Sequence, residues 1–216
     1  MIRSPTARLF VAVDPPEEVC ERLTLWAREA TRGAHPEGHT QEGAHGRQAR
    51  GHTKASVRVL DAELLHVTLC FLGNRPAGEM DALASELSTC SGRGGELSLG
   101  APLWLPERNP RALAVELHDE RGWLASLQAE AVAALQRVSG WQPNGGAHTG
   151  VKATASKRRF RPHVTVARLP GGEAPRQRAL PPTPSASFRP YELVLYRSWL
   201  SPEGANYEAV TTYPIA

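Results

Sequence analysis

The chain has 216 residues, 41% of them hydrophobic and 22% charged, and its formal net charge is +3. This length allows a full hydrophobic core in one domain or two small ones, and the small charge excludes nucleic-acid binding through an all-basic surface. No apolar stretch approaches the ~20 residues of a membrane span, and the apolar run at residues 9–15 is too short for a signal peptide. The three cysteines lack the spacing of a metal site, so we expect a reduced, cytoplasmic protein without membrane contact.

The first half of the chain alternates apolar strands with amphipathic helices. Residues 9–13 are all apolar, which is typical of a buried strand, and the Asp-Pro-Pro-Glu-Glu sequence at 14–18 predicts the start of a helix. Residues 33–56 are rich in Gly, His and Arg without apolar periodicity, so we expect a flexible insert there. The remaining elements of this half are expected in the order short strand, strand, helix, strand, at residues 57–60, 65–72, 80–87 and 97–105.

The second half repeats this order. The expected elements are a strand, a helix, a flexible insert and three further strands, at residues 112–117, 124–138, 139–156, 160–169, 191–200 and 207–213. The repeated order predicts a single α+β domain over residues 1–216, with two pseudo-symmetric lobes built from duplicated halves at about 8–105 and 111–213. We expect each lobe to hold an antiparallel sheet with outer helices, and the active-site cleft to lie between the lobes.

Two tetrapeptides of the same form, His66-Val67-Thr68-Leu69 and His163-Val164-Thr165-Val166, lie 97 residues apart in matching strands. Because side chains alternate along a strand, the histidine and the threonine of each copy share one face. A single copy is more often structural, but two copies at the same place of a repeated unit favour a shared site. Two imidazoles can divide proton donation and acceptance near neutral pH, and two hydroxyls can donate to phosphate oxygens. The motifs therefore predict metal-free chemistry on a phosphodiester.

These motifs with their flanks, Leu64 to Gly73 and Phe160 to Arg168, resemble those of the two-histidine (2H) phosphoesterase superfamily. Within that superfamily the chain most resembles the RNA 2′,3′-cyclic phosphodiesterases, which are also called 2′-5′ RNA ligases. The segments Arg8 to Pro16 and Leu195 to Ser198 match this family as well. The resemblance covers nearly the whole chain except the two inserts.

The resemblance implies a hydrolase, an RNA 2′,3′-cyclic 3′-phosphodiesterase that opens a terminal cyclic phosphate to a 2′-phosphomonoester. By motif position, His66 would be the proton donor to the departing 3′-oxygen and His163 the proton acceptor that activates water. Thr68 and Thr165 would bind the phosphate oxygens. The residues alone do not assign the two histidine roles, since the motifs are near twins. No cofactor or metal is implied.

Four further residues are candidates for binding the substrate, and they are Arg161, Arg168, Phe10 and Tyr196. Arginine offsets the charge of an RNA backbone, and aromatic rings stack on bases, although a ring in a strand is more often core. Strict alternation places Arg161 on the face of His163 and Arg168 on the opposite face, unless the strand twists or ends there. The same alternation places Cys70 on the face of His66, where we interpret it as a small packing residue.

Three alternatives stay open on the sequence. The same acid–base pair would also catalyse 2′-5′ RNA ligation, or act on a small cyclic nucleotide. From another class, the chain would be a non-catalytic module that binds RNA ends. The expected partner is RNA with a 2′,3′-cyclic phosphate end, such as a tRNA fragment or an oligonucleotide, and the expected state is a monomer.

Overall fold

The computed structural model describes residues 5–32, 57–90, 94–138, 141, 160–169, 179–201 and 204–215. Both expected inserts lie outside these residues, apart from Trp141, which is buried. No helix within the described ranges is long and apolar enough to cross a membrane.

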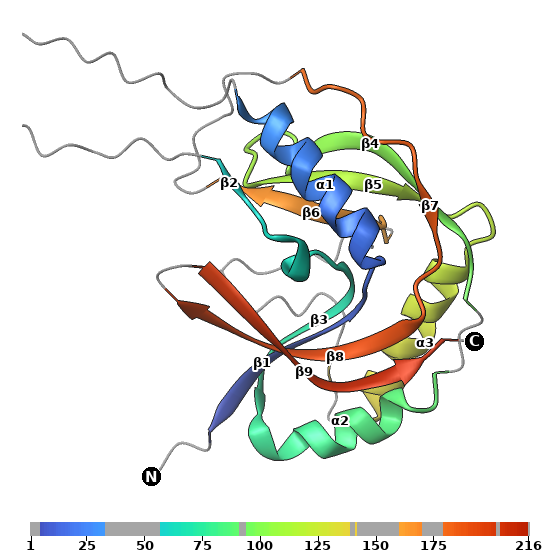
Figure 1. Ribbon diagram of the computed structural model, residues 1–216. Coiled ribbons are helices and arrows are strands. Elements are labelled where there is room, and N and C mark those ends of the chain that lie inside the picture. The colour runs from blue at the N-terminus through green and yellow to red at the C-terminus, as the bar shows by residue number, and fades with distance from the viewer. Residues whose placement is uncertain are drawn as a thin grey trace, which may run out of the picture.

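The strands form two antiparallel sheets (Figure 1). The first sheet has the order β3-β1-β8-β9, with β3 at Val67–Pro76, β1 at Thr6–Val13, β8 at Glu192–Ser201 and β9 at Gly204–Pro214. The second sheet has the order β2-β6-β5-β4-β7, with β2 at Arg58–Val59, β6 at His163–Arg168, β5 at Ala112–His118, β4 at Leu97–Leu105 and β7 at Ser187–Phe188. The expected α+β fold with two antiparallel sheets is confirmed.

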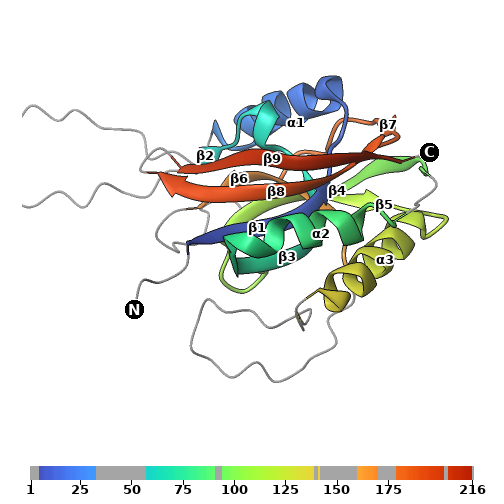
Figure 2. The same ribbon diagram turned by 90° about the horizontal axis from the view of Figure 1, so that it is seen from below.

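Within the described residues, three α-helices and two short 3-10 helices accompany the sheets. Their bounds are Glu17–Ala30 (α1), Ala62–Leu64 (η2), Ala77–Glu79 (η3), Met80–Leu87 (α2) and Trp123–Arg137 (α3). Helix α1 begins after Pro16 with two acidic residues in its first turn, as residues 14–18 predict, and acids there favour the positive end of the helix dipole. Helix α1 lies over the second sheet, and α2 lies under the first sheet with α3 beside it (Figures 1 and 2).

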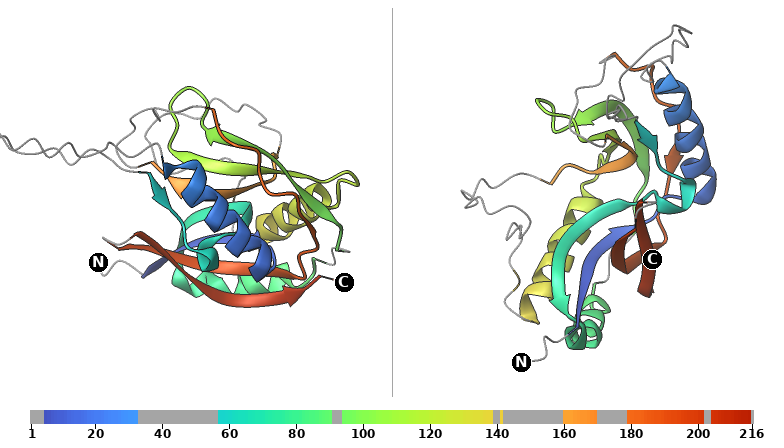
Figure 3. Two further views of the ribbon diagram at one scale, coloured as in Figure 1. Left: turned by 45° about the horizontal axis from the view of Figure 1, so that its top comes forward. Right: turned by 90° about the vertical axis from the view of Figure 1, so that its left-hand side faces the viewer.

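Each long helix contacts the sheet that does not contain the strand before it. Helix α1 follows β1 of the first sheet but contacts β6 and β2 of the second, and α3 follows β5 of the second sheet but contacts β3 of the first. Two views at right angles show the same crossing (Figure 3). The sheets also mix the halves of the sequence, because β8 and β9 complete the first sheet while β2 and β4 lie in the second. The duplication of the halves stays a prediction.

A single hydrophobic core joins both sheets and the helices. In β1 the alternate residues Leu9, Val11 and Val13 are fully buried in this core, and in β5 the core residues are Leu113, Val115 and Leu117. The intervening residues of both strands point to the opposite face of their sheet. We call that opposite face of each sheet its site face, because both histidines lie on it.

Candidate active site

The two histidines come from different sheets and lie near one another. His66 is the residue before β3, and His163 is the first residue of β6. Strands β3 and β6 are in contact, and the positive charge of protonated His163 acts on His66. The fold therefore brings together two residues that are 97 positions apart in the sequence.

Both imidazoles are held in the same way. The Nδ1 atom of His66 lies 2.9 Å from the carbonyl oxygen of Leu64, and that of His163 lies 2.8 Å from the carbonyl oxygen of Arg161. A carbonyl oxygen can only accept a hydrogen bond, so each Nδ1 carries a proton and donates it. In the neutral ring, Nε2 is then the atom with a free lone pair. Each motif thus presents one Nε2 for proton transfer.

Burial lowers the pKa of His66 to about 4 from its usual 6.5. The hydrogen bond to Leu64 opposes this shift, whereas the positive charges of Arg168 and His163 add to it. Desolvation disfavours the charged imidazolium, and nearby cations disfavour it further. In the ligand-free protein His66 is therefore neutral at pH 7, and a bound phosphate anion would favour its protonation.

The two threonines share the site face with the histidines, as alternation predicts. Both are half-buried, and neither hydroxyl has a hydrogen-bond partner among the described residues. Each lies opposite an alanine, because Thr68 pairs with Ala12 in β1 and Thr165 pairs with Ala114 in β5. The small alanine side chains leave both hydroxyls free to donate to a ligand.

Arg168 lies on the site face, and the parity argument from the sequence was wrong for this residue. In the β5–β6 pair, Ala114 lies opposite Thr165 but Leu113 lies opposite Ala167, so Val166 is an extra residue in β6. This β-bulge turns the rest of the strand over. Arg168 consequently pairs with Ala112 and points to the side of His163, near enough for its charge to act on His66.

A second β-bulge, in β3, places Cys70 on the face opposite to the one expected from the sequence. Ala12 pairs with Thr68, but Val11 pairs with Cys70, which leaves Leu69 as an extra residue in β3. Cys70 therefore points into the core with Val11 and not to the site face. Burial raises the pKa of its thiol to about 12. Its interpretation as a small packing residue fits this position.

Aromatic rings surround His66. The ring centroid of Phe10 lies 4.8 Å from that of His66, and Tyr196 stacks on Phe10 at 5.0 Å. A third ring, Tyr207 in β9, lies 5.1 Å from both Phe10 and His66. The structure thus places both aromatic candidates beside the histidine. Sequence reasoning missed Tyr207, because an aromatic residue at the start of an expected strand carries no signal that its ring would reach β1.

The hydroxyl of Tyr196 donates a 2.5 Å hydrogen bond to Asp14, which follows β1. Burial raises the pKa of Asp14, the hydrogen bond from Tyr196 opposes this shift, and the negative charge of Glu192 adds to it. The other carboxylate oxygen of Asp14 is buried without a partner among the described residues. This bond fixes the ring of Tyr196 against Phe10.

Arg161 differs from the other candidates because its side chain is already paired. Its Nε donates to Glu116 over 2.9 Å, and Glu107 lies 3.8 Å from its guanidinium. Its backbone carbonyl holds His163, as described above. Within the described part of the chain, no group of three or more His, Cys, Asp or Glu side chains could hold a metal ion.

Solved structures of phosphoesterases have the same fold as this chain, with two antiparallel sheets. No protein-family model matches the chain. The solved structures of a phosphoesterase and of E. coli LigT complexed with 3′-AMP match with TM-scores of 0.72 and 0.70, at 22% and 23% sequence identity. Each match covers 98% of this chain and 99% of the other. The chain therefore has the two-lobe fold of the LigT-like phosphoesterases.

A more specific likeness comes from the sequence. A curated RNA 2′,3′-cyclic phosphodiesterase from Geobacillus stearothermophilus is 30% identical in an alignment of 156 residues that covers 69% of this chain and 45% of that protein. The chain thus spans about half the length of this relative. This relative confirms the resemblance to the RNA 2′,3′-cyclic phosphodiesterases, and the structural matches confirm the fold.

Proposed function

We propose that this protein hydrolyses RNA 2′,3′-cyclic phosphate ends to 2′-phosphomonoesters without a metal ion. The observation that carries this proposal is the matched pair of imidazoles, each with Nδ1 bound to the carbonyl two residues earlier and Nε2 left for proton transfer. General acid–base catalysis needs one group to accept a proton and another to donate one. A pair from two sheets can act on opposite sides of one phosphorus atom.

In the proposed reaction, Nε2 of His163 takes a proton from water while the water oxygen attacks phosphorus. The bond from phosphorus to the 3′-oxygen breaks, and protonated His66 gives its proton to that oxygen. The phosphate stays on the 2′-oxygen. Thr68 and Thr165 donate to the non-bridging oxygens as negative charge develops on them. The donor role requires the substrate phosphate to raise the pKa of His66 from its low value in the free protein.

The aromatic cluster and Arg168 supply binding energy in this proposal. Phe10 is only 3% exposed, so its role is to support the ring of Tyr196, on which the terminal base stacks. Arg168 binds phosphate oxygens. Arg161 is held by Glu116, so its side chain reaches the substrate only if this ion pair opens. Its carbonyl orients the base His163 in either case.

The cellular setting belongs to the same proposal. The cysteines are free thiols, which fits a reducing, cytoplasmic environment. RNA ends, including tRNA fragments and oligonucleotides, are the proposed substrates, and the protein is proposed to act as a monomer.

Incubation of the protein with a 2′,3′-cyclic nucleotide, in the presence of a chelator, tests the proposed function. The expected product is the 2′-phosphate, and His66→Ala and His163→Ala should each lower turnover by at least ~100-fold, the usual scale for losing a general acid or base. His118→Ala is the matched control, because this histidine is exposed at the end of β5.

Other outcomes would overturn parts of this proposal. Loss of activity in the chelator would contradict the metal-free mechanism. Unchanged substrate with retained affinity would indicate a module that binds RNA ends. Addition of an RNA with a 5′-hydroxyl separates hydrolysis from ligation, because only ligation joins the two strands through a 2′-5′ bond.

A further inference from the structure

Two arginines from neighbouring strands lie side by side at the outer end of the site face. Arg58 in β2 pairs with Arg168 in β6 in antiparallel register. Cross-strand partners point to the same face, with their Cβ atoms roughly 5 Å apart. The bulge at Val166 puts that face on the side of His163 and Thr165. The two guanidinium groups therefore extend from the same side as the catalytic pair.

This arginine pair has no counter-charge within the described residues. Neither Arg58 nor Arg168 forms an ion pair there, whereas Arg161, near His163, pairs with Glu116 and Glu107. Two adjacent like charges repel each other, so the arrangement is unfavourable without an anion. A phosphate group suits it, because each guanidinium can donate two parallel hydrogen bonds.

The side chain of Arg58 packs on Gly204, the first residue of β9. A Cβ atom on Gly204 would lie 2.1 Å from Nη1 and 2.5 Å from Cζ of Arg58, so the guanidinium lies directly over the bare Cα of this glycine. Gly204 has φ of +134°, which a residue with a side chain rarely adopts. Arg58 thus spans from the second sheet to the first sheet beside the site.

Arg58 and Arg168 lie at a distance along the sheet from His163, where the reacting phosphate would bind. His163 and Arg168 are five residues apart in β6, which is roughly 16 Å of strand at 3.3 Å per residue. Arg168 lies near enough to the histidines for its positive charge to lower the pKa of His66. Arg58 lies one strand further out, in β2 at the edge of the sheet.

From this placement we propose that Arg58, together with Arg168, binds the internucleotide phosphate next to the reacting cyclic phosphate. The proposal rests on the proposed function and adds a substrate preference to it. A substrate with two or more nucleotides has this second phosphate, and a mononucleoside 2′,3′-cyclic phosphate lacks it. Arg58 therefore selects RNA ends over free cyclic nucleotides.

Three substrates test this inference. They are a 2′,3′-cyclic mononucleotide, a dinucleotide ending in a 2′,3′-cyclic phosphate, and the same dinucleotide with an uncharged methylphosphonate linkage. Arg58→Ala should lower kcat/KM for the charged dinucleotide by at least about 10-fold, the scale of a lost charge-assisted hydrogen bond. It should change kcat/KM for the other two substrates less than about 2-fold, because neither has the phosphate that Arg58 binds.

Two further variants and one control sharpen the result. Gly204→Ala displaces the guanidinium of Arg58 without removing its charge, and should produce the same selective loss. Arg58→Lys keeps the charge and should retain part of the preference. Arg121→Ala, an exposed arginine in the turn before α3, should behave as the unchanged protein. Thermal unfolding of each variant verifies that it is folded.

Equal loss on all three substrates, or no loss on any, would overturn the inference. If the unchanged protein hydrolyses none of them, the proposed function fails by itself. Calorimetry then measures the affinity of the protein for a 3′-phosphorylated dinucleotide and for its methylphosphonate form. The difference between the two affinities tests whether Arg58 binds the internucleotide phosphate. The preference for the charged linkage must be present in the unchanged protein and absent from Arg58→Ala.

Discussion

His66 couples the candidate site to the stability of the fold. Burial lowers the pKa of this imidazole from 6.5 to about 4, so between these values the unfolded chain binds a proton that the folded protein does not. The free energy of unfolding then rises with pH across this window. The burial of a neutral His66 is therefore tolerated at pH 7 and becomes unfavourable as the pH falls toward 4.

Replacement of His66 by Gln, which does not titrate, should flatten this pH dependence. The unchanged protein should lose up to about 3 kcal/mol of unfolding free energy through this group between pH 6.5 and 4, because the pKa of His66 falls from 6.5 in the unfolded chain to about 4 in the folded protein. Urea unfolding at a series of pH values measures the slope, with Arg121→Gln as an exposed control. An identical slope in His66→Gln and the unchanged protein would contradict the assignment.

The sequence predicts the histidines and threonines because a simple rule governs them. Each motif lies within a few residues of a strand start, before any bulge, so alternation places His66 with Thr68 and His163 with Thr165. The rule fails for Cys70 and for other residues beyond a bulge, since one extra residue reverses every following side chain. No composition signal in this chain marks those bulges.

At the scale of elements, regular periodicity predicts strands and helices well, but not their partners. The expected ranges 80–87 and 97–105 coincide with α2 and β4. The two-residue strand β2 lies within the short strand expected at residues 57–60, but so short an element has no period that would predict its partner. Its pairing with β6, and that of β9 with β8, bring Arg58 and Tyr207 to the site. The pairing of Arg58 with Arg168 is long-range and cannot be read from local patterns, whereas β9 pairs with the strand directly before it.

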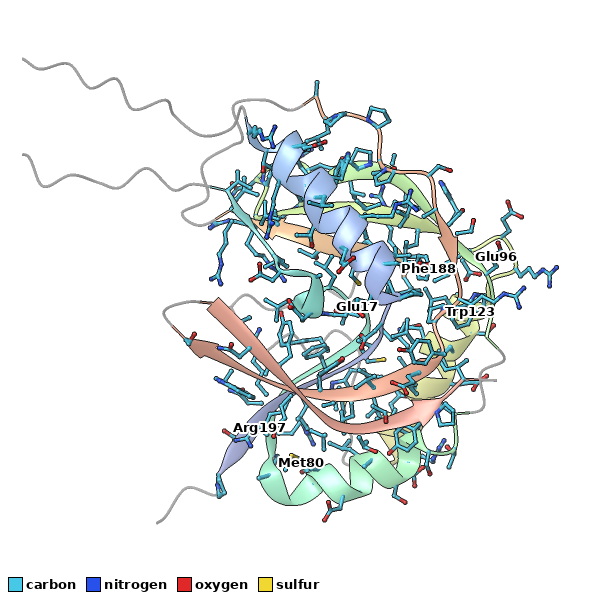
Figure 4. The ribbon with its side chains drawn as sticks, viewed as in Figure 1. Glu17, Met80, Glu96, Trp123, Phe188 and Arg197 are labelled. Carbon is cyan, nitrogen blue, oxygen red and sulfur yellow. The ribbon has the colours of Figure 1, made fainter. Side chains whose placement is uncertain are left out.

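The contact between the start of β4 and α3 shows how closely these elements pack. A Cβ atom on Gly95, two residues before β4, would lie 1.7 Å from Cδ1 of Trp123 and 2.1 Å from its Nε1. Trp123 is the first residue of α3 and lies beside Glu96 (Figure 4). Because the indole ring is a rigid plane, it cannot give way as a flexible side chain would.

Gly95→Ala should therefore destabilise the protein by about 1–3 kcal/mol, the usual cost of an extra methyl group in a packed position. Gly78→Ala is the matched control, because a Cβ there meets no atom within 4 Å. Urea denaturation measures both variants. If the two midpoints coincide, the close packing of Gly95 on Trp123 is not present in solution.

For the whole molecule, the relative position of the two histidines is set by the way each sheet combines strands from both halves of the sequence. The first sheet provides His66 and Thr68, while the second sheet provides His163 and Thr165. Neither half of the sequence completes its own sheet, and each long helix contacts the opposite sheet. The two histidines are thus held in one frame with a shared core, so their distance does not depend on a mobile domain interface.

This shared frame predicts that the two histidines act as one catalytic unit. If both histidines transfer protons in the same transition state, loss of either one removes most of the rate acceleration that the other provides. The double variant His66→Ala/His163→Ala should therefore be no more than about 10-fold slower than the slower single variant, although two independent losses of ~100-fold would multiply to about 10,000-fold. Turnover of a 2′,3′-cyclic nucleotide by the four proteins measures this, with enzyme concentrations high enough to detect the slowest. Multiplied losses would mean that the histidines act in separate steps, and the matched tautomers would then have another cause.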